Sequence, residues 1–302
     1  MLRFGVPILF VLIWSTGFIV GKAVVPHADL QLYLLARLSL TAAVLGAAAL
    51  AVRASWPRGR EWGPHLVAGV LMQGIYLCAS YWSISHGMAA GVMALLGALQ
   101  PLFTALFLVA GARARLGAQT WLGLVVGFAG VACVLAPKLA VAGAGSLTPA
   151  STAAALVSVV SITAGALVQK WLPAADLRSA GCVQNVGGAA VAVISVLVVG
   201  TDFWDGSPIL WGALTWAVLV PSVVGTTLLM WMMRHGEATK VTALILLAPP
   251  LAAIQAYFFF RETLSAVQFL GFALALGGVL LARASPPQRL RRSRLSRPCG
   301  ET

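Results

Sequence analysis

Ten apolar segments, separated by short polar connections, run along the chain. A helix needs roughly 20 mainly apolar residues, at about 1.5 Å rise each, to cross about 30 Å of bilayer hydrocarbon. The segments lie at residues 4–23, 30–51, 64–85, 89–110, 118–136, 150–170, 179–200, 208–231, 240–259 and 265–283. They are apolar on every side rather than alternating with period two, which excludes an outer-membrane barrel. The pattern predicts an all-α integral membrane protein with ten transmembrane helices.

The second half of the sequence repeats the first. Shifted by 148 residues, the segment 101–135 lies over 249–283. The shared residues include Pro101 and Pro249, Arg113 and Arg261, Gly123 and Gly271, and Gly130 and Gly278. Because each copy holds five helices, an odd number, the second copy enters the membrane from the opposite face. We therefore expect two inverted five-helix repeats, residues 4–136 and 150–283, with a solute site where the halves meet.

Composition and charge place these segments in a bilayer and orient them. Hydrophobic residues make up 60% of the chain and charged residues only 9%, whereas soluble domains carry about a quarter charged residues. With a cytoplasmic N-terminus, nearly all of the 20 Lys and Arg side chains fall on the cytoplasmic side, as the positive-inside rule requires. We expect a multi-pass protein of the cell inner membrane with both termini cytoplasmic. Residues 284–302 form a basic, disordered cytoplasmic tail in this prediction.

Polar side chains recur at helical spacing within several spans. Such groups find no partner in lipid, so a stripe of them faces the protein interior. The stripes comprise Gln73, Tyr76, Ser80 and Ser83; Met93, Gly97, Gln100 and Thr104; and Ser158, Ser161, Gly165 and Gln169. The helix-breaking residues Pro101, Pro249 and Pro250 free carbonyls one turn earlier for a solute, a water or a hydroxyl; a packing kink is the alternative.

Arg37 lies seven residues into the second span, where a charge is costly unless it faces protein, water or a partner. Snorkelling towards Asp29 and a role in a cavity or gate are equal alternatives. The fifth and tenth spans differ from the others, because their interhelical faces carry small residues and no polar side chain. These seams predict tight helix packing away from the solute; they are Gly123, Gly127 and Gly130, and Gly271, Ala275 and Gly278.

The sequence lacks the motifs of several classes of enzyme and of nucleotide-binding proteins. None of the carboxylates falls at the middle of a span, and the chain lacks paired aspartates, an HExxH zinc motif, a GxSxG nucleophile motif and a GxxxxGK[ST] phosphate loop. The four cysteines are scattered without metal-ligand or disulfide spacing. We therefore expect neither an enzyme nor a protein with a metal or cofactor.

The sequence resembles the EamA family of the drug/metabolite transporter superfamily. The resemblance rests on WSTGFIVGK at 14–22, LLARL at 34–38, QPLFTAL at 100–106 and the hairpin at 248–282. It implies inverted repeats around a central cavity and export of small metabolites or amino acids across a bacterial inner membrane. Carried onto this chain, the substrate-binding candidates are Trp14, Gln73, Tyr76, Tyr81, Gln100, Ser161, Gln169 and Thr226. The first repeat departs from the second at Ala114, where the second has Glu262.

The predicted function is secondary transport, with export of small metabolites, such as amino acids or amphipathic amines, by alternating access through a central cavity. Aromatic and amide side chains suit neutral, amphipathic or zwitterionic solutes. A passive small-solute channel and a non-transporting membrane interaction protein are the alternatives. The expected partners are a small-molecule substrate and the lipid bilayer, with no nucleic acid, and the protein is expected as a monomer or a homodimer.

Overall fold

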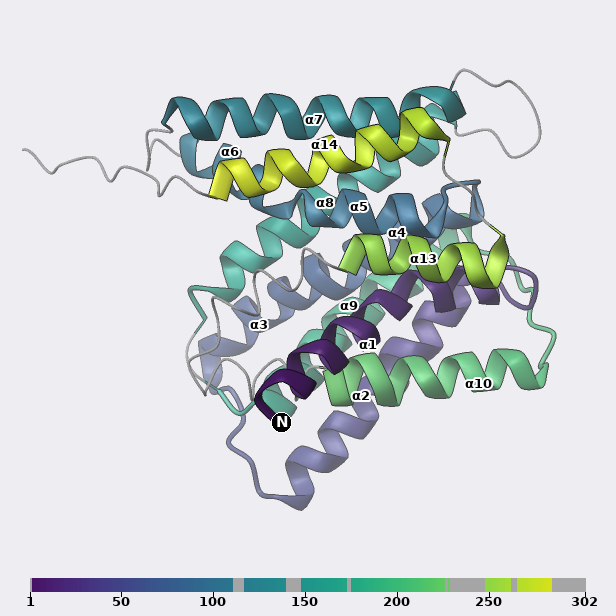
Figure 1. Cartoon of the computed structure of the whole chain (residues 1–302). Coiled ribbons are helices and arrows are strands. Elements are labelled where there is room, and N and C mark those ends of the chain that lie inside the picture. The colour runs from purple at the N-terminus through teal and green to yellow at the C-terminus, as the bar shows by residue number, and fades with distance from the viewer. Residues whose placement is uncertain are drawn as a thin grey trace, which may run out of the picture.

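The computed structural model describes residues 2–110, 117–139, 148–172, 175–225, 228, 248–261 and 265–283. Within these ranges the chain is helical, and β pairing is limited to one isolated bridge between Ala28 and Trp204. The helical elements are α1 (Leu2–Val24), α2 (Leu30–Ala51), η1 (Gly59–Glu61), α3 (Trp62–Gly69), η2 (Val70–Ile75), α4 (Tyr76–Ser85), α5 (Ala90–Ala98), α6 (Gln100–Ala110), α7 (Ala118–Leu139), α8 (Pro149–Gln169), α9 (Leu177–Val199), α10 (Pro208–Ala217), η3 (Val218–Gly225), α13 (Ala248–Phe260) and α14 (Ala266–Arg283) (Figure 1).

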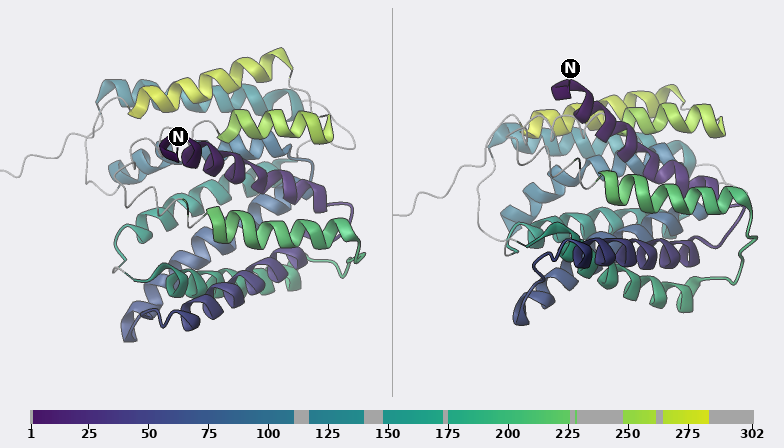
Figure 2. Two further views of the ribbon diagram at one scale, coloured as in Figure 1. Left: turned by 60° about the horizontal axis from the view of Figure 1, so that its bottom comes forward. Right: turned by 90° about the horizontal axis from the view of Figure 1, so that it is seen from below.

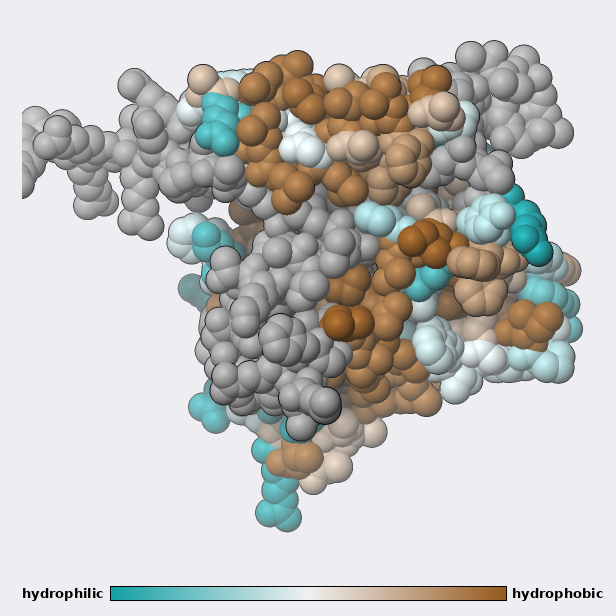
Figure 3. All heavy atoms as spheres, in the orientation of Figure 1, coloured by the Kyte–Doolittle hydropathy of each residue, from teal (hydrophilic) through white to brown (hydrophobic). Residues whose placement is uncertain are grey.

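The prediction of an all-helical membrane protein is confirmed. In the described part of the chain, six helical stretches are long and apolar enough to cross a bilayer: 30–51, 59–85, 90–107, 149–169, 177–199 and 208–225. Four shorter apolar helices, 8–24, 118–134, 250–260 and 266–281, correspond to the remaining predicted spans. Apolar side chains also dominate the surface over α7 and α14 (Figure 3).

Two tightly packed helix pairs form opposite edges of the molecule (Figures 1 and 2). One edge is α7 with α14, and the other is α2 with α9. The small-residue seams of α7 and α14 meet directly, since a methyl group on Gly271 would lie 2.6 Å from the carbonyl oxygen of Gly130. Larger side chains at these positions would separate the two helices.

Helix α1 lies between the two edges. Two main clusters of buried apolar side chains fill the interior, one among α5 to α8 and α14 and the other among α2, α4, α9 and α10. Phe18 of α1 packs against both of them and against a third, smaller cluster. Helix α1 begins and α14 ends at the same end of the helix bundle (Figure 1).

Two spans contain π-helical turns. The predicted span 64–85 is interrupted by η2, and the predicted span 208–231 contains η3 with Pro221 inside it. Proline has no N–H, so it cannot bond the carbonyl four residues earlier. The Ser222 hydroxyl donates to that carbonyl oxygen, on Ala217, at 2.9 Å. A π turn inserts about one extra residue, which rotates the following helical face by about 100°.

Candidate functional site

Three consecutive residues of α1 bond to three different helices. The Gln255 amide of α13 donates to Ser15 Oγ at 2.9 Å, and the Trp216 indole of α10 donates to Thr16 Oγ1 at 3.2 Å. The carbonyl oxygen of Gly17 accepts a hydrogen bond from the Tyr81 hydroxyl of α4 at 2.9 Å. The Ser15–Gly17 segment therefore links elements from both halves of the chain.

Arg37 lies beside this segment and is buried, with 8% of its surface exposed. Its Nη1 donates to the Tyr81 hydroxyl at 3.1 Å, while its Nε is buried without a hydrogen-bond partner. Among the described residues no carboxylate forms an ion pair with it. Asp29, the proposed snorkelling partner, instead caps α2 by accepting from the amides of Gln31 and Leu32. Among the residues that the structure describes, the hydrogen-bond partner of the buried Arg37 is therefore a tyrosine.

Tyr81, the partner of Arg37, belongs to a group of aromatic side chains on α1, α2 and α4. Tyr33, one helical turn before Arg37, stacks on the Tyr81 ring with centroids 6.4 Å apart. The Tyr33 hydroxyl donates to the Ala213 carbonyl at 3.1 Å. Tyr76 meets Phe18 edge-on at 6.4 Å. Gly21 completes the arrangement, because a methyl group there would lie 2.8 Å from the Tyr81 ring.

The other predicted substrate-binding residues lie apart from this cluster. Trp14 is 40% exposed and contacts Phe10, and Gln169 is exposed and accepts from Gln184 at 2.8 Å. The Ser161 hydroxyl donates to the Leu71 carbonyl oxygen at 2.8 Å.

Gln73 and Gln100 are half-buried and also lie apart. Gln73, inside the π turn of η2, lies against Gly188 of α9, whereas Tyr76 and Tyr81 contact α1. The Gln100 backbone carbonyl accepts from the Thr104 hydroxyl at 2.8 Å. Thr226 and the side chains of Pro101 and Pro249 are outside the described residues, and Pro250 is half-buried in the first turn of α13.

Sequence reasoning missed Ser15, Thr16, Tyr33 and Trp216 as partners of this cluster. Tyr33 is four residues before Arg37, and such pairs share a helix face; that spacing was the available signal. Ser15 and Thr16 gave little signal, because a hydroxyl in an apolar helix usually bonds its own backbone. Both hydroxyls do so here, to Leu12 and Ile13, as well as accepting from α13 and α10.

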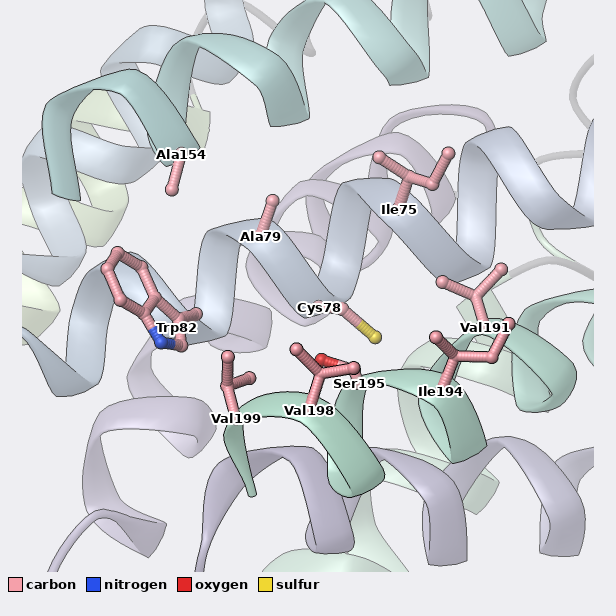
Figure 4. Close-up of a pocket in the computed structure, with 10 residues that line it drawn as sticks. All are labelled: Ile75, Cys78, Ala79, Trp82, Ala154, Val191, Ile194, Ser195, Val198 and Val199. Atoms are coloured by element: carbon pink, nitrogen blue, oxygen red, sulfur yellow. The ribbon is translucent and has the colours of Figure 1, made fainter. Parts of the chain in front are cut away.

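A separate groove with a volume of about 340 Å³ lies on a different face of α4 (Figure 4). Its walls come from η2 and α4, α8 and α9. The lining residues are Ile75, Cys78, Ala79, Trp82, Ala154, Val191, Ile194, Ser195, Val198 and Val199. Apolar side chains predominate, which distinguishes the groove from the polar cluster around Arg37.

A family model and a related sequence both point to a transporter, and a solved structure shows the same fold. The model of the EamA-like transporter family matches residues 5–136 and 148–284. An uncharacterized transporter from Archaeoglobus fulgidus is 35% identical over 74 residues, which are 24% of this chain and 27% of that protein. The match therefore spans about a quarter of that relative's length. A protein of known crystal structure, 19% identical, superposes with a TM-score of 0.61 over 92% of this chain and 95% of its own, and shares the fold.

Proposed function

Since the chain belongs to the EamA-like transporter family, we propose that it is a secondary transporter that exports zwitterionic amino acids across the inner membrane by alternating access. In this proposal ten helices form two inverted five-helix repeats with both termini in the cytoplasm. The family model matches the chain twice, once in each half, which supports the repeat. Inverted repeats place a substrate site between the halves in many secondary transporters.

The buried Arg37 is the observation that carries the choice of substrate. A buried charge without an opposite charge is costly, and the Arg37 Nε has no partner. A solute carboxylate would supply the opposite charge and accept from this donor. The rings of Tyr33, Tyr76 and Tyr81 next to it suit an ammonium group or an apolar side chain. An amino acid carries all of these groups, whereas an amphipathic amine lacks the carboxylate.

Proteoliposomes test this proposal. Vesicles loaded with a mixture of amino acids and amines should release amino acids in a saturable manner with counterflow, and amines should be retained. Release of amines alone would contradict the substrate class. Non-saturable release without counterflow would indicate a channel, and no selective release of any solute would contradict transport.

The variant Arg37→Gln tests whether the positive charge of Arg37 binds the solute. Loss of one charge-assisted hydrogen bond costs about 1.5–3 kcal/mol, so half-saturation should shift upward by about 10–100-fold. The matched control is Arg60→Gln, which alters an exposed arginine of η1 and should leave transport unchanged.

A further inference from the structure

The groove between α4, α8 and α9 exists because helices that touch at one end diverge towards the other. At the closed end, α9 meets η2 at glycines, since a methyl group on Gly74 or Gly188 would lie 2.7 Å from Val191 or Gln73 respectively. Beyond this contact α4 and α9 separate. The side chains that face the gap at Ala79, Ala154 and Ser195 are too small to fill it (Figure 4).

Hydrogen bonds link the helices that form the groove. The Gln31 side chain of α2 donates to the Cys78 carbonyl at 3.2 Å and accepts from Ser195 Oγ at 2.8 Å, which joins α4 to α9. The Ser83 hydroxyl donates to the Ser151 carbonyl at 2.7 Å, which joins α4 to α8. These bonds fix the positions of α4, α8 and α9, so the groove is a defined part of the fold. Its opening faces away from α2.

Exposed apolar side chains flank the opening, as expected of a surface that contacts the bilayer. Ile194 and Val198 of α9 line the groove and are 61% and 74% exposed. The Ser195 hydroxyl proton is already donated to Gln31, so the lining offers little to a polar solute. Water is unfavourable in an apolar cavity, and an unfilled gap forfeits the dispersion contacts of its walls. A flexible hydrocarbon chain satisfies both conditions.

We propose that this groove is a binding site for one acyl chain of a membrane phospholipid. The segment from Ile75 to Trp82 spans seven residues of helix rise, about 10 Å, or roughly a third of the hydrocarbon thickness. Trp82 lies at the wide end, stacked on His86 with centroids 3.9 Å apart. Tryptophan favours the boundary between hydrocarbon and headgroups, so the chain enters at Trp82 and its terminus points towards Ile75. The bound chain contacts helices from both halves of the protein.

Photolabelling of the full-length protein tests the site directly. The protein is placed in nanodiscs that contain phosphatidylethanolamine with a diazirine in one acyl chain, and the labelled residues are mapped by mass spectrometry. The expected result is labelling that saturates at one lipid per chain and maps to 75–82 and 191–199. Labelling that rises without saturation and spreads over other exposed positions, such as Val125 of α7, would overturn the proposal. Protection of α9 in a dimer of this chain would also overturn it.

Two matched variants provide an independent readout. Ala79→Phe fills the groove and should lower labelling of these peptides by about tenfold, equivalent to about 1.4 kcal/mol. Ala190→Phe places the same ring on an exposed position of α9 that does not line the groove, and should leave labelling unchanged. Equal labelling of both variants contradicts the site. The labelling of the unaltered protein decides the question if Ala79→Phe fails to fold, and neither experiment depends on which solute is transported.

Discussion

Tyr81 holds Arg37 and the backbone of α1 at the same time. Its hydroxyl accepts from Arg37 and donates to the Gly17 carbonyl, while its ring fills the space above Gly21. The bond to Arg37 is buried and the bond to Gly17 is partly buried, and an unsatisfied buried group costs about 1–3 kcal/mol. Substitutions around this single side chain can therefore distinguish the stability that its hydrogen bonds contribute from the stability that its packing contributes.

The two glycines of α1 should respond differently to the same substitution. Gly21→Ala places a methyl group 2.8 Å from the Tyr81 ring, and such overpacking costs about 1–3 kcal/mol. Gly17→Ala meets nothing within 4 Å and should stabilise the helix by up to about 1 kcal/mol. Thermal unfolding in detergent measures both. Equal midpoints for the two variants would contradict the close approach of Tyr81.

Removal of the Tyr81 hydroxyl should destabilise the protein without changing its packing. Tyr81→Phe leaves the Gly17 carbonyl and Arg37 without their described partner, at a cost of about 2–3 kcal/mol. Tyr257→Phe is the control, because Tyr257 is 45% exposed on α13. The free energy of unfolding should fall for the first variant only, and a comparable loss in both would show that the two bonds of Tyr81 add no specific stability.

At the scale of elements, the loop after α1 in the first half is bonded to the loop before α10 in the second half. We call this contact, between residues 27–29 and 201–207, the clasp. The Asp29 amide donates to the Phe203 carbonyl at 2.8 Å, and the Asp205 amide donates to the His27 carbonyl at 2.9 Å. The side chains of His27 and Asp205 pair at 2.6 Å. The clasp holds the end of α1 to the start of α10.

The clasp should open as the pH falls through the titration of Asp205. The Ser207 amide donates to this carboxylate and, with His27, lowers its pKa below the ordinary value. A lowered pKa in the folded state means that the carboxylate stabilises the clasp fully above its ordinary pKa of about 3.9. That contribution is lost as the pH falls through the lowered value.

Spin labels at Val25→Cys and Asp202→Cys, in a chain without its native cysteines, measure this opening as a longer distance in acid. Asp205→Asn, with Asp29 unaltered, should give a distance distribution that does not change over the same pH range. An acid-induced change that persists in Asp205→Asn would show that another group is responsible.

Hydropathy predicted the regular elements because length and apolar content alone decide which segments cross a bilayer. The predicted 30–51 coincides with α2, and 118–136 matches most of α7. The π turn of η2 was not predictable, since its extra residue leaves the hydropathy of the segment unchanged. The predicted polar stripe from Gln73 to Ser83 depended on continuous α-helical spacing along this segment. Gln73, inside the π turn, lies against α9 while Tyr76 contacts α1. Tyr33 and Arg37, on an uninterrupted helix, share one face.

At the scale of the whole molecule, the edges and the centre have different roles. The glycine seams of α7 and α14 bring the backbones together, so we expect this pair to stay packed in any conformational change. Helix α1 instead contacts several elements through a few polar bonds and the Phe18 ring. The proposed alternating-access cycle therefore requires that bonds around α1 and the clasp change while the edge pairs persist.

A disulfide across the clasp tests whether the halves must separate during transport. Ala28 and Trp204 face each other in the antiparallel bridge, where Cα atoms lie about 4.5–5.5 Å apart, within the range a disulfide spans. In a chain without native cysteines, Ala28→Cys with Trp204→Cys should transport when reduced and stop when oxidised, and reductant should restore flux. Each single variant should be insensitive to oxidation. Because a passive pore needs no separation of the halves, undiminished flux through the oxidised double variant would exclude a cycle in which α1 and α10 part at this end.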